Sequence, residues 1–394
     1  MKTAIVIGGG IAGCSTAYAL AKRGISVILI ERHIKIAAET SGNALAMLYP
    51  RLSGDNHLSQ FALTGYLHTL ELLSELNIAE TDFNACGLLQ LGFNARELTR
   101  IEKVGRQNIA NIKYITAHAA SKLADIELDY DALYISNAGW VKPAALCKSL
   151  ITHKNISVLT LSNVDKILIS NKLIEINFNK NQSLSADIVV VCNANDAQLL
   201  NQCSHIKTIA VRGQISLCKA TSQSQQLKTI ICGEGYLSPA VENIHSLGAT
   251  FSAQHTHLEV NEKDHEANLS MLKDMCKTLH STLQFNSGRA ALRCSTPDYL
   301  PLVGQLLDST KLQVKPPRPY ALNNSIPWIN GLYINVAHGS RGFISAPLCA
   351  ELLACIICDE PYPVNETLAG LLNPNRFLLR GLGLKRLSKQ IASS

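Results

Sequence analysis

A glycine-rich turn between a predicted strand and a predicted helix limits what this chain can fold into more than any other feature. Residues 3–7 are a β-branched apolar run, typical of a buried parallel strand. Gly8, Gly10 and Gly13 follow at G-x-G-x-x-G spacing, and residues 14–22 form a helical segment rich in small residues. Residues 26–30 are the next predicted strand. This order predicts a βαβ unit that binds a dinucleotide.

Each glycine of this turn has a mechanical role. Gly8 makes the tight turn out of the strand, Gly10 lets a pyrophosphate approach the backbone, and Gly13 lets the helix pack closely on the sheet. The pyrophosphate then lies at the positive end of the helix dipole. Glu31 ends the second strand, where a carboxylate accepts hydrogen bonds from ribose hydroxyls and disfavours NADP. The spacing alone does not separate NAD from FAD.

Composition sets the broad class of protein. The 394 residues exceed one typical domain, so two cores are expected, and a net charge of +6 permits a polyanionic partner without requiring one. The twelve cysteines lie mostly in apolar stretches, which predicts free thiols in a reducing cytosol and no metal site. The longest apolar segment, residues 342–358, contains Pro347 and Glu351 and is shorter than the ~18 apolar residues of a membrane span. We expect a soluble, cytoplasmic protein.

Hydrophobic periodicity gives a coarse organisation of the remaining chain. Helical spacing is found in three segments and strand-like runs in three others: helices at residues 58–76, 266–279 and 346–358, strands within 156–178 and at 187–191 and 331–336. A proline-rich stretch at residues 311–327 resembles a linker. We predict a discontinuous nucleotide-binding domain with a substrate domain inserted twice: residues 1–76, 136–204 and 320–394 for the first, 77–135 and 205–319 for the second.

Several longer motifs carry a family resemblance. They are SGN at 41–43, LYPRL at 48–52, GWVKP at 139–143, RAALRCSTPD at 289–298, LPLVG at 300–304, HGSRG at 338–342 and APLCAELL at 346–353. With the N-terminal glycines, this set resembles the D-amino-acid oxidase and glycine oxidase superfamily of FAD enzymes. More narrowly, with LLNPNRF at 371–377, it is similar to the FAD-dependent domain of the bifunctional MnmC family of tRNA-modification proteins.

The resemblance implies FAD as cofactor and an α/β (α+β) fold, D-amino-acid oxidase-like, in which a Rossmann-like FAD-binding domain carries an inserted mixed β-sheet substrate domain. In the family, the carboxymethyl group of 5-carboxymethylaminomethyl-2-thiouridine in tRNA is removed to leave the 5-aminomethyl base. The sequence starts at the flavin-binding strand, so we expect only the oxidoreductase half, with a separate methyltransferase for the next step. The turn at residues 192–195 lacks a glycine that the superfamily often has.

Three residues are candidates for the reaction centre. The resemblance implies that Arg293 binds the substrate carboxylate, for which a guanidinium offers two parallel bonds, although an ion pair with Asp298 is the structural alternative. Tyr236 is a candidate to cap the substrate pocket, or else packs in the core. His338 lies in the loop that passes the flavin ring in this superfamily and is a candidate for the reaction centre through that loop; a general-base role is the less favoured alternative, because a neutral substrate amine can react without an enzymic base.

Cofactor contacts are expected at both ends of the nucleotide-binding domain. The candidates are Gly8, Gly10, Ile11, Ala12, Gly13, Glu31, Arg32, Ser41, Gly42, Asn43, Asn193, Ala194, Gly339, Ser340, Arg341, Gly342 and Phe343.

The C-terminal residues are the clearest charge asymmetry of the sequence. From residue 375 to 394 there is no acidic residue, and we predict contacts to tRNA phosphates from five cations: Arg376, Arg380, Lys385, Arg386 and Lys389. A solubilising tail is the alternative. Two other functions also stay open, an oxidase of free glycine, sarcosine or another small amino acid, and a flavin-bearing tRNA-binding protein without turnover.

Overall fold

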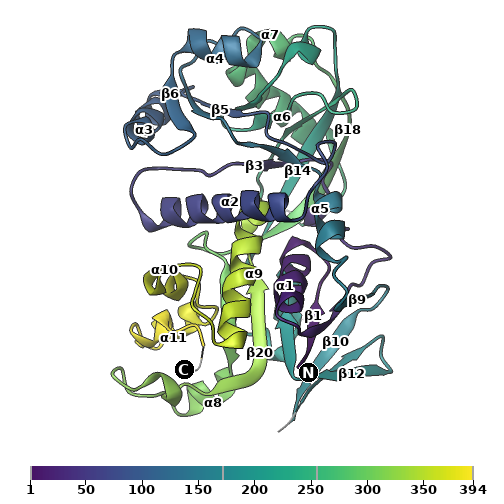
Figure 1. The fold of residues 1–394 in the computed structure, drawn as a ribbon, viewed down its shortest axis with the longest axis vertical. Coiled ribbons are helices and arrows are strands. Elements are labelled where there is room, and N and C mark those ends of the chain that lie inside the picture. The colour runs from purple at the N-terminus through teal and green to yellow at the C-terminus, as the bar shows by residue number, and fades with distance from the viewer. Residues whose placement is uncertain (1, 171–172, 254–255, 393–394) are drawn as a thin grey trace.

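The structure is a computed structural model, which describes residues 2–170, 173–253 and 256–392. Figure 1 shows two halves along the long axis, with the N-terminal strand and the C-terminal helices in the lower half. Helix α2 (His57–Glu75) lies between the halves. The predicted α/β class is confirmed.

A six-stranded sheet forms the centre of the lower half. Its order is β19-β20-β13-β1-β2-β9, and every neighbouring pair is parallel except the antiparallel edge pair β19–β20. The two strands predicted around the glycine turn are confirmed with the expected bounds. The strands are β1 (Thr3–Ile7), β2 (Ser26–Ile30), β9 (Ile156–Leu159), β13 (Ile188–Val191), β19 (Leu302–Leu307) and β20 (Trp328–Val336).

Both faces of this sheet are covered, which explains the uninterrupted apolar run of β1. Ala4 and Val6 pack into a core with the helices α1 (Ile11–Lys22), α5 (Pro143–Leu150) and α9 (Gly342–Cys358). Ile5 and Ile7 pack on the other face against the antiparallel sheet β10 (Val164–Ile169), β11 (Ile174–Phe178) and β12 (Gln182–Ala186). Alternate residues of one strand therefore serve two cores.

Helices α1 and α9 begin earlier than predicted. Gly10 is the N-cap of α1, so its first turn includes Ile11 and Ala12, and α9 begins at Gly342. Residues 339–358 are the one stretch of the described chain long and apolar enough to cross a membrane. Most of α9 is buried, and the helix packs against α1 and α2 (Figure 1), as a core helix of a folded domain does.

An eight-stranded mixed sheet forms the upper half. Its order is β18-β14-β17-β16-β15-β5-β7-β6, so strands from both predicted insertions share one sheet. The strands are β5 (Leu88–Leu91), β6 (Ile112–Ile115), β7 (Ala132–Ile135), β14 (Ile209–Lys219), β15 (Ile230–Cys232), β16 (Tyr236–Leu237), β17 (Ile244–Gly248) and β18 (Phe285–Ser295), and the accompanying helices are α3 (Ala95–Gly105), α4 (Ala117–Ala124), α6 (Glu262–Met275) and α7 (Lys277–His280). A small sheet, β3 (Ala46–Leu48), β8 (Gly139–Val141) and β4 (Phe83–Asn84), lies beside α9.

One predicted domain bound is wrong. Strand β19 was assigned to the substrate domain, but it pairs with β20 at the edge of the six-stranded sheet. The predicted linker overlaps α8 (Ser309–Val314), whose Leu312 is buried with Leu307 of β19. The apolar character of β19 matches both sheets, so composition alone could not assign it. The other domain bounds stay predictions.

The C-terminal residues pack against the lower half of the molecule and do not form a free tail. After α10 (Glu366–Leu371) and α11 (Arg376–Gly381), Leu384 and Leu387 are buried with Leu307 and Leu312. The backbone N–H of Gln305 in β19 donates to the carbonyl oxygen of Ile391, 2.9 Å away. Leucines among the cations of this segment therefore anchor it to the lower half.

Candidate active site

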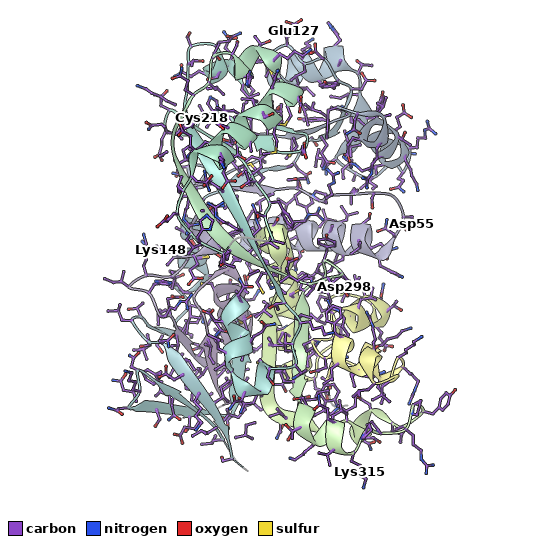
Figure 2. All side chains as sticks on the ribbon, turned by 180° about the vertical axis from the view of Figure 1, so that it is seen from behind. Asp55, Glu127, Lys148, Cys218, Asp298 and Lys315 are labelled. Atoms are coloured by element: carbon purple, nitrogen blue, oxygen red, sulfur yellow. The ribbon has the colours of Figure 1, made fainter. Side chains whose placement is uncertain are left out.

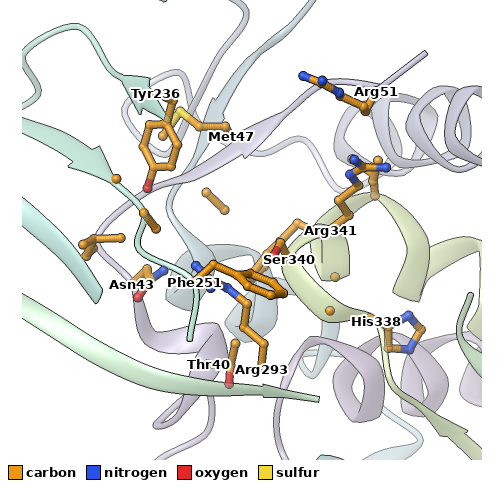
Figure 3. A pocket seen from close by; sticks show the side chains of 18 of the residues that line it. Thr40, Asn43, Met47, Arg51, Tyr236, Phe251, Arg293, His338, Ser340 and Arg341 are labelled. Atoms are coloured by element: carbon orange, nitrogen blue, oxygen red, sulfur yellow. The ribbon is translucent and has the colours of Figure 1, made fainter. Parts of the chain in front are cut away.

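Two adjoining cavities meet at the N-terminus of α1. The larger has a volume of about 690 Å³ and lies between α1, the loop before α9 and the eight-stranded sheet (Figure 3). The smaller, about 170 Å³, runs along the ends of β1 and β2 past Glu31. Both are lined by Gly10, Thr40, Ser41, Cys192 and Ala194. Every predicted cofactor residue except Gly13 and Gly42 lines one of the two.

The three glycines of the turn differ in the space around them. Gly8 has a φ of +107°, and a Cβ added there would lie 2.8 Å from the carbonyl oxygen of Cys192. A Cβ at Gly13 would lie 1.8 Å from the carbonyl oxygen of Gly8, so both positions require glycine for the protein's own packing. A Cβ at Gly10 would meet only Ser41 Oγ, at 3.3 Å. Gly10 therefore borders open cavity.

The smaller cavity holds polar groups at the end of β2. Glu31 is 7% exposed, and its two carboxylate oxygens accept hydrogen bonds from the backbone N–H groups of Gly9 (2.7 Å) and His33 (2.8 Å). Arg32 also lines this cavity, where its guanidinium is ion-paired with Glu39 and Asp196. The carboxylate thus has a fixed orientation at the cavity wall.

The turn after β13 supplies unsatisfied polar atoms to the same region. Ala194 has a φ of 52°, and the side-chain oxygens of Asn193 and Asn195 are buried without a hydrogen-bond partner. Buried polar groups without a partner are uncommon in folded proteins. Asn193 lines the smaller cavity, where a polar ligand would supply its missing hydrogen bond, although this turn lacks the glycine that the superfamily often has.

The loop between β2 and β3 is held in place by contacts with the glycine turn and with Arg289 of β18. Ser41 Oγ accepts a hydrogen bond from the backbone N–H of Ile11 (3.0 Å), and Asn43 Oδ1 accepts one from Arg289 Nη1 (3.1 Å). Arg289 also donates to the backbone oxygens of Ala38 and Glu39. Gly42 faces this contact rather than a cavity, because a Cβ there would lie 2.6 Å from the carbonyl oxygen of Ala37.

Arg293 of β18 brings a positive charge to the larger cavity. Within the described chain it has no carboxylate partner, and its one hydrogen bond is from Nη1 to the carbonyl oxygen of Thr250, 3.1 Å away. The alternative partner, Asp298, is instead paired with Arg376. Burial lowers the pKa of Arg293 from its usual value, and Tyr236 partly offsets this, but an arginine stays charged at neutral pH.

Strand β14 leaves room for this guanidinium. Gly213 lies on the strand that pairs with β18, and a Cβ added there would be 2.0 Å from Arg293 Nη1. The side chain of Arg293 therefore lies across the backbone of Gly213. No sequence motif around Gly213 indicates that this glycine makes room for the side chain of Arg293.

Tyr236 of β16 lines the same cavity from the opposite side (Figure 3). Its hydroxyl is 3.3 Å from Ser246 Oγ, and burial raises its pKa, so the phenol is neutral at physiological pH. The structure brings Tyr236 and Arg293 to one cavity from strands far apart in the sequence.

His338 uses both ring nitrogens for hydrogen bonds within the fold, which argues against the alternative role of general base. Nε2 is 3.0 Å from Asn335 Oδ1, and Nδ1 is 3.0 Å from Ser345 Oγ. Asn335 donates to Thr16 through Nδ2, which assigns the proton of the ring to Nε2. Burial lowers the pKa of His338 to about 3. The imidazole is a neutral structural group that fixes the loop before α9.

The N-terminus of α9 faces the larger cavity. Gly339, Ser340, Gly342 and Phe343 line it, and Arg341 is the N-cap with no side-chain cap hydrogen bond. The first backbone N–H groups of a 17-residue helix are thus turned toward the cavity without a capping side chain. Such a terminus stabilises negative charge.

Arg376 is corrected as a tRNA contact. Its side chain is 0% exposed, and it donates to both carboxylate oxygens of Asp298, from Nε (2.9 Å) and Nη2 (2.6 Å). Figure 2 shows Asp298 beside the C-terminal helices. The other four predicted cations, Arg380, Lys385, Arg386 and Lys389, are exposed.

Several cavity residues have no place among the sequence predictions. Met47, Arg51, Phe93, Arg96 and Phe251 all line the larger cavity. Arg51 lies in the quoted LYPRL motif, which could have indicated it. The others lie in segments without a motif, and only the folding of α3 and of the loop after β17 onto the cavity identifies them.

Comparison with known proteins decides the family. The family model described as FAD dependent oxidoreductase matches residues 3–356. This chain is a member of that family of FAD-dependent oxidoreductases. The resemblance to MnmC is also confirmed: the tRNA 5-methylaminomethyl-2-thiouridine biosynthesis bifunctional protein MnmC of Methylobacillus flagellatus is 42% identical over 396 residues, and that of Pseudomonas savastanoi pv. phaseolicola is 38% identical over 408. The alignments cover 99% and 97% of this oxidoreductase but 61% and 60% of those relatives.

Solved structures confirm the D-amino-acid oxidase-like fold of the oxidoreductase. Glycine oxidase from Geobacillus kaustophilus superposes with a TM-score of 0.78 at 18% identity, covering 95% of this chain and 99% of that one. L-proline dehydrogenase from P. horikoshii gives 0.77 at 19% identity, with 96% and 98% covered.

FAD, the cofactor of the oxidoreductase, fits the two cavities. Gly10 leaves room at the helix terminus for a pyrophosphate, Glu31 lies where ribose hydroxyls donate, and Asn193 offers an unsatisfied oxygen. The larger cavity continues from this point to the N-terminus of α9. Among the described residues, no group of three His, Cys, Asp or Glu side chains is placed to hold a metal, and all twelve cysteines are free thiols.

Proposed function

We propose that this oxidoreductase acts on tRNA and removes the carboxymethyl group of 5-carboxymethylaminomethyl-2-thiouridine to give 5-aminomethyl-2-thiouridine. The identity to MnmC proteins over nearly the whole chain supports the substrate. The side chain of this base is an N-substituted glycine, a secondary amine one carbon away from a carboxylate. A site for it needs a cation that neutralises the carboxylate and fixes its orientation.

The unpaired Arg293 is the observation that carries the proposal. A buried guanidinium without an anion is unfavourable in the free protein, and a substrate carboxylate supplies the missing partner. Two parallel N–H···O bonds fix the plane of the carboxylate, and therefore the position of the adjacent methylene carbon. A flavin-bearing protein without turnover would have no use for this arrangement.

The other cavity residues assist by orientation and charge. Tyr236 keeps a neutral hydroxyl on the far wall, and the N-terminus of α9 favours negative charge at its side of the cavity. Bound FAD would supply the redox chemistry, as the acceptor of a hydride from the methylene carbon that Arg293 orients. Water then adds to the oxidised C=N bond and breaks it, so the products are the primary amine and glyoxylate.

Exposed cations at the lower end of the molecule are a proposed contact to the tRNA backbone. Arg380, Lys385, Arg386 and Lys389 are exposed, and Arg386 donates to the carbonyl oxygens of Tyr320 and Ala321. That contact brings the loop after α8 next to them, with three more exposed cations, Lys311, Lys315 and Arg318. Figure 2 shows Lys315 at this end. Phosphates are the complementary ligand.

The cellular setting is part of the same proposal. A tRNA-modifying enzyme works in the cytoplasm, and the 5-aminomethyl product is the acceptor for a methyl group. We propose that a methyltransferase consumes this product. The chain spans about 60% of the length of its curated relatives, so the methyltransferase is either another protein or a further domain.

Anaerobic flavin absorbance tests the proposal. The FAD-loaded protein is mixed with tRNA that carries 5-carboxymethylaminomethyl-2-thiouridine, and the loss of the oxidised flavin band is followed. The proposal predicts reduction by this tRNA and none by the same tRNA without the modification. Reduction by glycine or sarcosine alone, with the modified tRNA inert, would assign the protein to free amino acids instead.

A further inference from the structure

The larger cavity has an outer wall that the flavin and Arg293 do not use. Phe93, Asn94, Arg96 and Glu97 line it from the start of α3. Phe251 lines it from the loop after β17, and Figure 3 shows this ring in the same cavity as Arg293. A free amino acid small enough to bind between Arg293 and a flavin would leave this wall in contact with water alone.

Two aromatic rings stand on this wall. Phe251 is 60% exposed, although a phenylalanine side chain gains about 25 cal/mol for each Å² of apolar surface removed from water. Phe93 is half-buried, and its Cδ1 would be 3.4 Å from a Cβ added at Gly233 on the neighbouring strand end. Exposed aromatic faces beside a positively charged groove are the surfaces on which unpaired bases stack.

The outer wall of the cavity carries a net positive charge, and ion pairs hold two of its guanidinium groups in place. Glu97 accepts a hydrogen bond from Arg51 Nη2 at 2.7 Å and another from Arg100 Nε at 2.8 Å, so one carboxylate holds two guanidinium groups. Arg100 also donates to the carbonyl oxygen of Leu52, which ties the Arg51 loop to α3. Arg96 is exposed and has no ion-pair partner in the described part of the chain.

One acidic residue opposes this charge. Glu234 is exposed and lines the cavity from the turn between β15 and β16. No described residue forms an ion pair with it. Its negative charge repels a phosphate at this side of the opening. The distribution of charge therefore favours an approach of RNA over α3.

We propose that this wall is a nucleotide subsite of the same active site: Phe251 and Phe93 stack on the bases of an unpaired RNA loop, and Arg96 binds a flanking phosphate. The inference rests on the proposed function, because it assumes that the reacting glycine unit is attached to a nucleobase. It adds the residues that distinguish an RNA substrate from a free amino acid. The ion pair of Arg51 with Glu97 holds the loop that carries Arg51 against α3 at the edge of the cavity.

The test compares two substrates on two variants, Phe251→Ala and Arg96→Gln. Stacking on an aromatic side chain is generally worth a factor of about 5 to 150, so Phe251→Ala should raise KM for the modified tRNA by that factor, and Phe251→Tyr should restore it. Arg96→Gln should flatten the salt dependence of log KM by about 0.7. Reduction by sarcosine and flavin content should stay at wild-type values in both variants.

Arg106→Gln is the matched control, since Arg106 follows the same helix at its other end and is 79% exposed. Its KM and salt slope should equal those of the wild type. The subsite is overturned if tRNA reduces the wild type but both variants keep its KM and slope, or if sarcosine and tRNA turnover fall together. Failure of tRNA to reduce even the wild type would instead overturn the proposed function.

Discussion

Arg293 combines burial, positive charge and the lack of an anionic partner in the described chain, and this combination defines the reaction centre at the scale of single residues. Replacement by methionine keeps the length of the side chain and removes the charge. We expect Arg293→Met to weaken substrate binding and flavin reduction by on the order of 2–5 kcal/mol, as for other desolvated charge pairs. Stopped-flow flavin reduction against substrate concentration measures this.

The flavin content of Arg293→Met should match the wild type, because Arg293 lines only the larger cavity and not the smaller one, where Glu31 and Asn193 are placed to bind the ribose and pyrophosphate of FAD. Arg293→Lys is the control: it keeps the charge but loses the two-pronged geometry, so an intermediate effect is expected. Unchanged reduction kinetics in the methionine variant would remove Arg293 from the site.

His338 makes a prediction about pH and stability. Its folded pKa of about 3 is below its unfolded value of about 6.5, so the folded state favours the neutral ring. The stability from this group is complete above pH 6.5 and falls as the pH drops toward 3, by about 1.4 kcal/mol for each pH unit.

Urea denaturation of wild type and His338→Asn at pH 7.5 and pH 5 checks this. The difference in unfolding free energy between the two proteins should narrow by about 2 kcal/mol at the lower pH. A constant difference would show that His338 is not held neutral in the fold.

At the scale of elements, the glycines of the turn between β1 and α1 have different roles: one is required for packing of the fold and another for ligand binding. Gly10→Val adds atoms to open cavity, so the protein should fold with near wild-type thermal stability but lose most of its bound FAD. Gly13→Ala forces a contact with the Gly8 carbonyl and should destabilise the fold itself. Flavin absorbance and thermal denaturation of both variants measure this; equal flavin content in wild type and Gly10→Val would contradict it.

The elements also show what the sequence could and could not predict. β1 and β2 were predicted with their bounds because apolar runs with sharp glycine ends leave little choice. The starts of α1 and α9 were missed because Gly10 and Arg341 cap them, and neither makes a capping hydrogen bond through its side chain. β19 was assigned to the wrong sheet because strand pairing over long separations has no local signal.

The candidate site residues likewise divide into those that the sequence could predict and those that it could not. Residues on the glycine turn were found from local chemistry, and Arg293 from a family motif. The roles of Gly213 and Phe251 depend on which strand or loop lies opposite in space, and this is a property of the fold alone.

At the scale of the whole molecule, the C-terminal segment combines packing with charge. Arg380→Gln, Lys385→Gln and Lys389→Gln should each flatten the dependence of log KM for tRNA on log salt by about 0.7–0.9 and leave stability unchanged. Lys122→Gln, on α4 at the opposite end of the molecule, is the control and should have no effect. If the dependence of log KM on log salt equals that of the wild type in all three variants, these side chains are exposed to solvent and do not contact tRNA.

Arg376 is expected to behave differently from its neighbours. Its removal breaks the two short bonds to the partly buried Asp298 and leaves that carboxylate with Arg380, 3.9 Å away, as its ion-pair partner, so Arg376→Met should lower the unfolding free energy by about 3–5 kcal/mol. Truncation after Phe377 would remove the buried Leu384 and Leu387, so a loss of tRNA binding in that variant would not distinguish a lost contact from a destabilised fold. A stable Arg376→Met protein with weakened tRNA binding would contradict its structural role.

Mass spectrometry of tRNA nucleosides tests the central claim most directly. Modified tRNA is incubated with the FAD-loaded protein, digested and compared with an untreated sample. The account predicts loss of 5-carboxymethylaminomethyl-2-thiouridine, appearance of 5-aminomethyl-2-thiouridine, and release of glyoxylate in equal amount. Unchanged nucleosides, under conditions in which a free amino acid reduces the flavin, would contradict it.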